Sequence, residues 1–136
     1  MTSQSWSIPA VAAEVGDLRR AITRYVTSHR VADPPVSDMK VAVSEAVTNA
    51  VVHGFPSGNP GTVTVLVTVD EPAALLTVVV TDDGSGVRPR PDSPGLGLGL
   101  PLITTLARTA KISAGPDGHG TRVRMTFGLD CPGVLS

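Results

Sequence analysis

The sequence has little charge, few aromatic side chains and a single cysteine, and each scarcity excludes a class of protein. Only 17% of its 136 residues are charged, and the formal net charge is -1. No run of Lys and Arg is longer than the pair Arg19-Arg20, so the chain lacks the basic stretch that would hold a nucleic acid. Because there are only one Trp, one Tyr and two Phe, the core must be built from aliphatic side chains.

The single cysteine and the hydropathy pattern both indicate the cellular compartment in which the protein is expected. Cys131 has no second cysteine to pair with, and we expect an incidental thiol in a reducing compartment. No apolar run is long enough to cross a bilayer, and the N-terminus lacks the cationic start and apolar run of a signal peptide. We therefore expect a soluble, cytoplasmic protein that binds neither a membrane nor a nucleic acid directly.

Apolar periodicity predicts one domain over residues 1–136, with a flexible tail from about residue 129. Alternation typical of strands and three- and four-residue spacing typical of helices follow one another along the chain. The expected elements are a short strand at 6–8, helices over 11–26 and 36–52, strands over 62–69 and 74–81, a helix over 100–110, and strands over 111–114 and 121–127.

The order of these elements indicates the fold class. Strands that come in hairpins form antiparallel pairs, which excludes a doubly wound parallel sheet. The sequence therefore predicts an α+β fold, a two-layer α/β sandwich whose mostly antiparallel mixed sheet has helices on one face.

The helix expected over 36–52 carries the first candidate site. Glu45 and Asn49 stand one turn apart among the small apolar residues Val41, Ala42, Ala46 and Val52. A carboxylate in such surroundings needs a cation or a hydrogen-bond donor, and the two side-chain oxygens could share a hydrated Mg²⁺ and a nucleophile. Taken alone, an ordinary surface pair is the simpler interpretation.

The second candidate is Asp82-x-Gly84-x-Gly86, directly after the most apolar strand. A carboxylate at a strand end can accept a hydrogen bond from an amino-bearing heterocycle, and glycines let the ring approach the backbone. Taken alone, Asp-Gly is more often a simple turn.

The third candidate is a loop with Gly95, Gly97 and Gly99 that enters a helix. Exposed backbone N–H groups at such a loop form an anion site that suits a phosphate chain. There is no Gly-Lys-Ser/Thr, so the loop is not a P-loop, and the glycine run alone is a weak signal.

Together, and followed by Gly120-Thr121 on the last strand, the three motifs resemble the Bergerat ATPase domain shared by gyrase, histidine kinases and mismatch-repair ATPases. The stretch Val43–Gly54 (VSEAVTNAVVHG) looks specifically like the anti-sigma-factor serine kinases of sporulation and general stress. The resemblance covers essentially the whole chain.

The resemblance implies a role for each motif in a protein that uses ATP and Mg²⁺. Asn49 would hold Mg²⁺ bridging the ATP phosphates, Glu45 would be the general base for a partner's serine hydroxyl, and Asp82 would accept the adenine amino group. The remaining implied ATP-binding residues, in the adenine pocket and the lid, are Thr121, Gly84, Gly86, Gly95, Gly97 and Gly99.

The implied partners are a sigma factor, an anti-anti-sigma protein phosphorylated on serine, and a second copy bound through the N-terminal strand and helix. The alternative to this homodimer is that the apolar face of the N-terminal helix belongs to the core. One departure leaves alternatives open. The better-known kinases have a longer lid with an arginine just before the glycine run. Here the lid over 87–94 is short, Asp92-Ser93-Pro94 precedes the glycine run, and Arg88 and Arg90 are the available cations. A non-catalytic ATP-dependent binding module is therefore the second interpretation. A histidine-kinase catalytic domain is the third.

Overall fold

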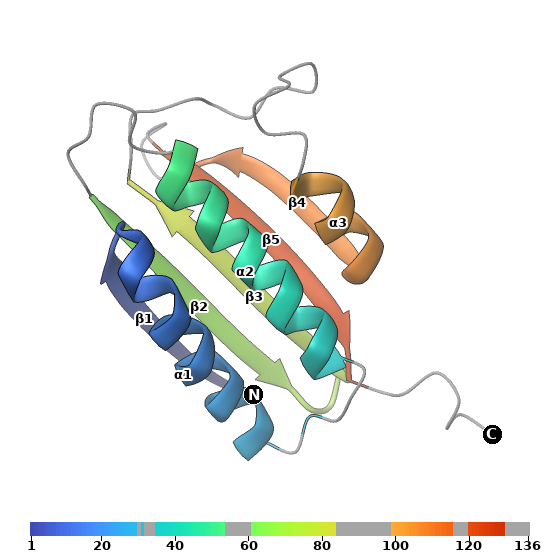
Figure 1. The fold of residues 1–136 in the computed structure, drawn as a ribbon. Coiled ribbons are helices and arrows are strands. Elements are labelled where there is room, and N and C mark those ends of the chain that lie inside the picture. Colours follow the sequence, from blue (N-terminus) through green and yellow to red (C-terminus); the bar gives the residue numbers. More distant parts are fainter. Residues whose placement is uncertain (30, 32–34, 54–60, 84–98, 116–119, 130–136) are drawn as a thin grey trace.

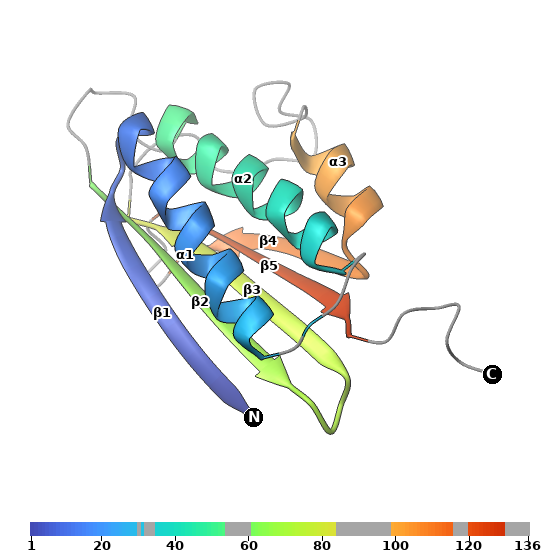
Figure 2. The ribbon, with the colours of Figure 1, turned by 60° about the horizontal axis from the view of Figure 1, so that its bottom comes forward.

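In the part of the chain that the structure describes, five strands form one layer and three α-helices cover one side of it (Figures 1 and 2). The computed structural model describes residues 1–29, 31, 35–53, 61–83, 99–115 and 120–129. In chain order the elements are β1 (Thr2–Pro9), the 3-10 helix η1 (Ala12–Glu14), α1 (Val15–Ser28), α2 (Pro35–His53), β2 (Thr62–Asp70), β3 (Leu75–Asp82), α3 (Gly99–Leu106), β4 (Thr109–Ala114) and β5 (Thr121–Gly128).

The sheet has the strand order β1-β2-β3-β5-β4, and all four of its pairings are antiparallel in the described part of the chain. This confirms the expected α+β sandwich with helices on one face. None of the helices in the described ranges is both long and apolar enough to cross a membrane.

The first strand is longer than its sequence pattern predicts. It pairs with β2 from Thr2, opposite Val69, to Pro9, opposite Thr62. Hydroxyl groups tie the strands together as well, since Ser3 Oγ lies 2.9 Å from the Thr68 hydroxyl oxygen. A strand at the edge of a sheet buries few of its side chains, so the apolar alternation that reveals a strand is weak here.

The helix expected over 100–110 is wrong at its C-terminal end, because α3 stops at Leu106 and β4 begins at Thr109. The N–H of Arg108 donates to the Thr126 carbonyl at 2.7 Å, and Thr109 faces Thr126 in the ladder with β5. Pairing with β5 therefore overrides the local helical pattern in this short segment.

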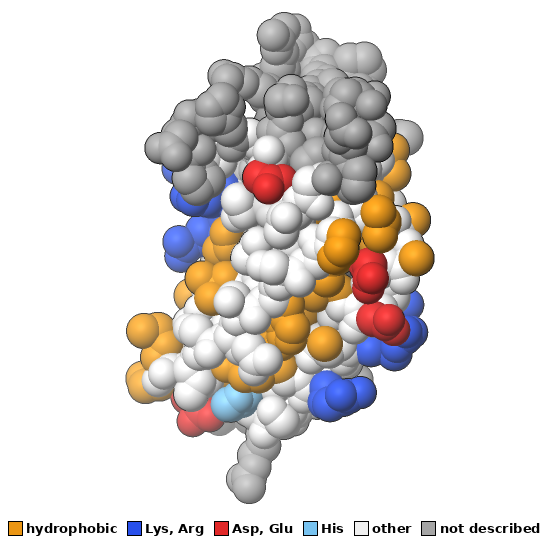
Figure 3. Space-filling view, turned by 90° about the vertical axis from the view of Figure 1, so that its left-hand side faces the viewer, with side chains coloured by type: hydrophobic (Ala, Val, Ile, Leu, Met, Phe, Trp, Pro, Cys, Tyr) orange, Lys and Arg blue, Asp and Glu red, His pale blue; other side chains and the backbone are white. Residues whose placement is uncertain are grey.

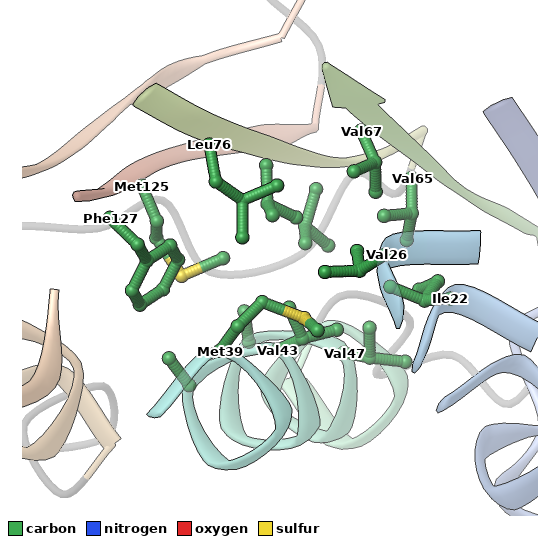
Figure 4. Packing of buried hydrophobic residues seen from close by; sticks show 14 of the residues in the cluster. Ile22, Val26, Met39, Val43, Val47, Val65, Val67, Leu76, Met125 and Phe127 are labelled. Carbon is green, nitrogen blue, oxygen red and sulfur yellow. The ribbon is translucent and has the colours of Figure 1, made fainter. Parts of the chain in front are cut away.

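The core fills the space between the sheet and the helices (Figure 4). Alternate valines of β2 (Val63, Val65, Val67 and Val69) are at most 1% exposed, and they face residues such as Ile22 of α1. Each such buried aliphatic side chain contributes about 1.5–3 kcal/mol relative to an exposed one. The buried side chains that alternate along β2 and β3 thus hold the sheet and the helices together.

Helix α2 lies between α1 and α3 on the sheet (Figure 1), and this position corrects one expectation. Ala42 and Ala46 were expected beside Glu45 on the outer side, but they are 0% and 3% exposed. A helix with neighbours on both flanks buries a wider arc than a helix that contacts only a sheet. The side of α2 that packs on the sheet is buried, and its residues include Met39, Val43 and Val47.

The structure describes Leu129, the residue near which the flexible tail is expected to begin. Leu129 packs against the core, and its N–H donates to the Ala74 carbonyl at 2.9 Å. The rest of the expected tail, Cys131 included, lies outside the described residues.

Candidate functional site

One end of the molecule gathers the described parts of the predicted motifs. The C-terminal end of α2, the end of β3 and the start of α3 lie at the same end of the sandwich (Figure 1). The start of β5 is also there, because Thr121 faces Asp82 in the sheet. The fold therefore unites segments that are far apart in the sequence.

Asp82 is the last residue of β3 and its side chain lies on the inner, helix-covered face. It continues the buried series Val78 and Val80, and it is only 5% exposed. A carboxylate removed from water is costly unless it is hydrogen-bonded. Its place at the end of the strand, next to Thr121, suits an acceptor that meets a polar ligand entering between the layers.

Gly120 lies directly against Asp82. Its φ is +71°, and a Cβ added there would lie 1.9 Å from the Asp82 carbonyl oxygen and 3.1 Å from Asp82 Oδ1. Only glycine therefore permits this approach of β5 to β3. The sequence motif included Gly120-Thr121, but Gly120 was not assigned to the site; its signal is a glycine immediately before the last strand.

Asp83 fixes the direction in which β3 ends, and sequence reasoning assigned it no role. The Thr62 N–H donates to Asp83 Oδ1 at 2.8 Å, and the Asp83 N–H donates to the Thr62 carbonyl at 3.3 Å. These two bonds tie the end of β3 to the start of β2, which holds the preceding Asp82 on the inner face.

Glu45 and Asn49 are both half-buried on α2. The α1 flank of this helix is marked by Ser44, whose Oγ accepts a hydrogen bond from Arg19 Nη1 at 3.5 Å. Five residues along a helix amount to a rotation of about 140°, so Asn49 lies on the opposite flank, toward α3. Glu45 lies between these two flanks, on the outer surface.

The phosphate-binding part of the prediction is only partly described. Gly99 is the first residue of α3, whereas Gly84, Gly86, Gly95 and Gly97 lie outside the described residues, as do Arg88 and Arg90. The structure thus brings together Asn49, Asp82, Thr121 and Gly99 at one end, and the lid glycines stay a prediction.

The residues present fit a magnesium ion held mainly by a nucleotide. Among the described residues, no group of three or more His, Cys, Asp and Glu side chains could hold a metal alone. Mg²⁺ in nucleotide sites keeps several waters and takes one or two protein ligands besides the phosphates. The side-chain oxygen of Asn49 can supply such a single ligand.

Comparison with known proteins finds one family model and several related anti-sigma factors. The family described as "Histidine kinase-like ATPase domain" matches residues 8–127. The anti-sigma F factor of Clostridium acetobutylicum is 32% identical over 101 residues, which are 66% of this chain and 68% of that protein. The anti-sigma F factor of Clostridium botulinum is 29% identical over 118 residues, 79% of this chain and 80% of the relative.

Two solved structures are similar in fold. One contains the RsbU and RsbW domains of a Mycobacterium tuberculosis protein; it aligns with 97% of this chain and 34% of its own, at a TM-score of 0.75 and 20% identity. The other is the histidine kinase domain of a blue-light activated kinase from Erythrobacter litoralis. It aligns with 90% of this chain and 62% of its own, at a TM-score of 0.58 and 26% identity.

We predict that Gly120→Ala is strongly destabilising, because its Cβ would collide with the Asp82 carbonyl at a backbone conformation that alanine disfavours. A loss of more than about 2 kcal/mol in the free energy of unfolding is expected from such combined strain. Urea denaturation followed by circular dichroism measures it.

Gly16→Ala is the matched control. Its Cβ would meet only the Arg20 guanidinium at 3.5 Å, an ordinary contact, and alanine favours a helix. Equal stability changes for the two variants would contradict the proposed close approach.

Proposed function

This chain belongs to the histidine kinase-like ATPase domain family and groups with its anti-sigma factors, and on this premise we propose that it is an ATP-dependent protein-serine/threonine kinase. It sequesters a sigma factor and phosphorylates an anti-anti-sigma partner on serine. The observation that carries the proposal is the convergence of Asn49, Asp82 and Thr121 at one end of the sandwich.

In this proposal the adenine ring enters between the layers at the end of β3. The Asp82 carboxylate accepts a hydrogen bond from the exocyclic amino group, and Thr121 lines the same place on β5. The tight approach of Gly120 to Asp82 supports this role, because it holds the acceptor still before any ligand arrives. Gly84 and Gly86 complete the pocket, and Gly95, Gly97 and Gly99 bring backbone N–H groups to the phosphates.

Asn49 is the proposed protein ligand of Mg²⁺. When bound, Mg²⁺ neutralises charge on the phosphates during phosphoryl transfer. The half-buried position of Asn49 on the α3 flank of α2 supports this role, since α3 begins with the last glycine of the predicted lid.

Glu45 is the proposed general base. It accepts the proton of the partner's serine hydroxyl while the serine oxygen bonds to the γ-phosphorus and the bond to the ADP oxygen breaks. Its place on the outer surface of α2 leaves it within reach of a protein substrate. Val41 and Val52 on the same surface are 44% and 60% exposed, and they offer a partner protein apolar contacts around the carboxylate.

The second candidate is a binding module in which ATP tunes shape without turnover. The short sequence of the lid, with Asp92 before the glycine run, favours it, because few cations are left to meet the terminal phosphate. The presence of Glu45 favours the kinase, because a module that only sequesters its partner needs no base.

The proposed partners place the protein in the cytoplasm, where sigma factors act. A homodimer is also proposed, through β1 and α1. The edge strand β1 has eight residues without a charged side chain, and natural sheets usually protect such edges. Figure 3 views this side: uncharged side chains run through its middle, and charged ones lie toward its margins.

Replacing the adenine acceptor tests the nucleotide assignment. Asp82→Asn removes a charge-assisted acceptor, for which a loss of about 1.5–3 kcal/mol is expected. Isothermal calorimetry with ATP measures the change. Asp83→Asn is the control, because this exposed neighbour keeps an oxygen to accept from Thr62 and should bind ATP normally. Unchanged ATP affinity in Asp82→Asn removes Asp82 from the adenine role.

Replacing the proposed metal ligand tests the Mg²⁺ assignment. Asn49→Ala should abolish the tightening of ATP binding by Mg²⁺ and leave the fold intact, whereas Thr48→Ala, at the exposed neighbouring position, should not. Calorimetric titrations in Mg²⁺ and in EDTA provide the comparison. Wild-type protein that binds ATP equally well in both solutions would refute the metal assignment.

Removing the proposed base separates kinase from binding module. Glu45→Gln keeps size and polarity, so it should bind Mg·ATP normally and transfer phosphate about 10²–10⁴-fold more slowly. Radiolabelled transfer to anti-anti-sigma proteins measures the rate, with the exposed turn variant Glu71→Gln as the control. A fully active Glu45→Gln variant would show that another residue is the base. If the wild-type protein transfers no phosphate, the kinase proposal fails and the binding module is the remaining candidate.

A further inference from the structure

On the face of the sheet opposite to the described helices (Figure 2), a groove of about 660 Å³ is lined by charged residues that are all cations. Its charged residues are Lys111 of β4 and Arg122 and Arg124 of β5. Leu66 and Val79, from β2 and β3, supply its apolar surface, and the other residues of its lining are serine and threonine. We call this surface the outer groove. It lies on the side of the sheet opposite to Asp82.

The cations of the outer groove repel one another. Lys111 and Arg124 face each other directly across the β4–β5 ladder. Arg122 lies two residues before Arg124 in β5, so its side chain is on the same face of the sheet. Like charges directly opposite on neighbouring strands destabilise a sheet. Within the described ranges, the side chains of these three residues make no ion pair or hydrogen bond with another residue, and the ion pair present there is Arg20–Asp17 on α1.

Among the residues that the structure describes, no carboxylate lines the outer groove. The acidic residue of β2 on the same face, Asp70, is at the far end of its strand, where Oδ1 accepts from the Ala73 N–H at 3.2 Å. The described part of the chain therefore places no carboxylate against these three neighbouring positive charges, and an anionic ligand would remove the repulsion.

The apolar part of the groove and the lack of aromatic rings distinguish between anionic ligands. Single-stranded nucleic acids bind sheet faces by stacking on aromatic side chains. The groove has none, because Trp6 points inward and packs on Tyr25 of α1 with ring centroids 5.6 Å apart. Leu66, by contrast, is 41% exposed beside the cations, which suits a ligand with both carboxylates and aliphatic side chains.

We propose that the outer groove is a docking site for an acidic segment of a partner protein, with carboxylates on Lys111, Arg122 and Arg124 and aliphatic side chains on Leu66 and Val79. Its occupant and a nucleotide bind at the same time. The two sites are on opposite faces, since Arg122 and Asp82 occupy adjoining strands but point to different sides of the sheet.

Two synthetic peptides of equal length and equal Glu content probe this site, one with Leu and one with Ser between the acidic residues. Fluorescence anisotropy should show that the Glu/Leu peptide binds more tightly than the Glu/Ser peptide. Its affinity should fall as salt is added, because exposed charges are screened. Equal affinity for the two peptides, or no binding of either, would refute the proposal.

Two triple variants with the same change in charge make the test specific. Replacing Lys111, Arg122 and Arg124 by Thr should weaken binding of the Glu/Leu peptide about tenfold or more, since each exposed pair contributes modestly and three are lost. Replacing Arg19, Arg20 and Arg24 of α1 by Gln should leave the affinity for the Glu/Leu peptide within about twofold of the wild-type value. Equal weakening in both variants means non-specific attraction and refutes the site.

Two competitors separate the outer groove from other anion sites. Saturating Mg·ATP should leave the affinity of the Glu/Leu peptide unchanged, and displacement by ATP would place the peptide in the nucleotide site instead. A single-stranded oligothymidine should bind more weakly than this peptide. Tighter oligonucleotide binding that the Thr variant abolishes would identify a nucleic-acid surface and overturn the proposal.

Stability gives a readout that does not depend on the probe. Because the Thr variant relieves repulsion between facing cations and keeps residues that favour strands, its thermal midpoint at low salt should be at least that of the wild type. A lower midpoint would show that the cations stabilise the fold, and it would remove the reason to infer a ligand.

Discussion

The pairing register of β2, β3 and β5 is the constraint on which both surfaces of the molecule depend. Side chains alternate along a strand, so a slip of one residue would move every one of them to the other face. The observed register buries the valines of β2 and Val78 and Val80 of β3, and these hold the helices to the sheet. The same alternation carries Asp82 inward at the end of β3 and turns Arg122 and Arg124 outward.

This constraint explains how an acidic residue comes to be buried at the place where the proposed nucleotide site lies. Asp82 sits where the hydrophobic series ends, with Gly120 against it and the next residue, Asp83, tied to Thr62. These contacts restrain the strand end, and preorganised groups lose less entropy on binding. The helix residues Glu45 and Asn49 depend on the same packing, because Val43 and Val47 fix the rotation of α2 on the sheet.

Much of the fold could be predicted from the sequence, because strong periodicity marks β2, β3 and the buried face of α2. The errors in element bounds occur where pairing between distant segments determines the structure. β1 is longer than expected because it pairs with β2 along its whole length, and α3 ends early because Thr109 pairs with β5. Motif order predicts Asn49 and Asp82 as site residues, and the fold brings them to one end of the molecule, but their roles stay a prediction. Gly120 could not be assigned, because its role depends on the carbonyl of a residue 38 positions earlier in the chain. The outer groove could not be predicted from the sequence either, because its cations become neighbours only through strand pairing.

The central claim is that ATP binds between the layers at the end where α2, β3 and β5 meet. Amide hydrogen exchange with and without Mg·ATP tests it most directly, since it maps protection along the whole chain. The account predicts slower exchange at the C-terminal end of α2 and around Asp82 and Thr121, with no change in β4 at Lys111. Protection confined to the outer face of the sheet, or no protection at saturating Mg·ATP, would contradict it.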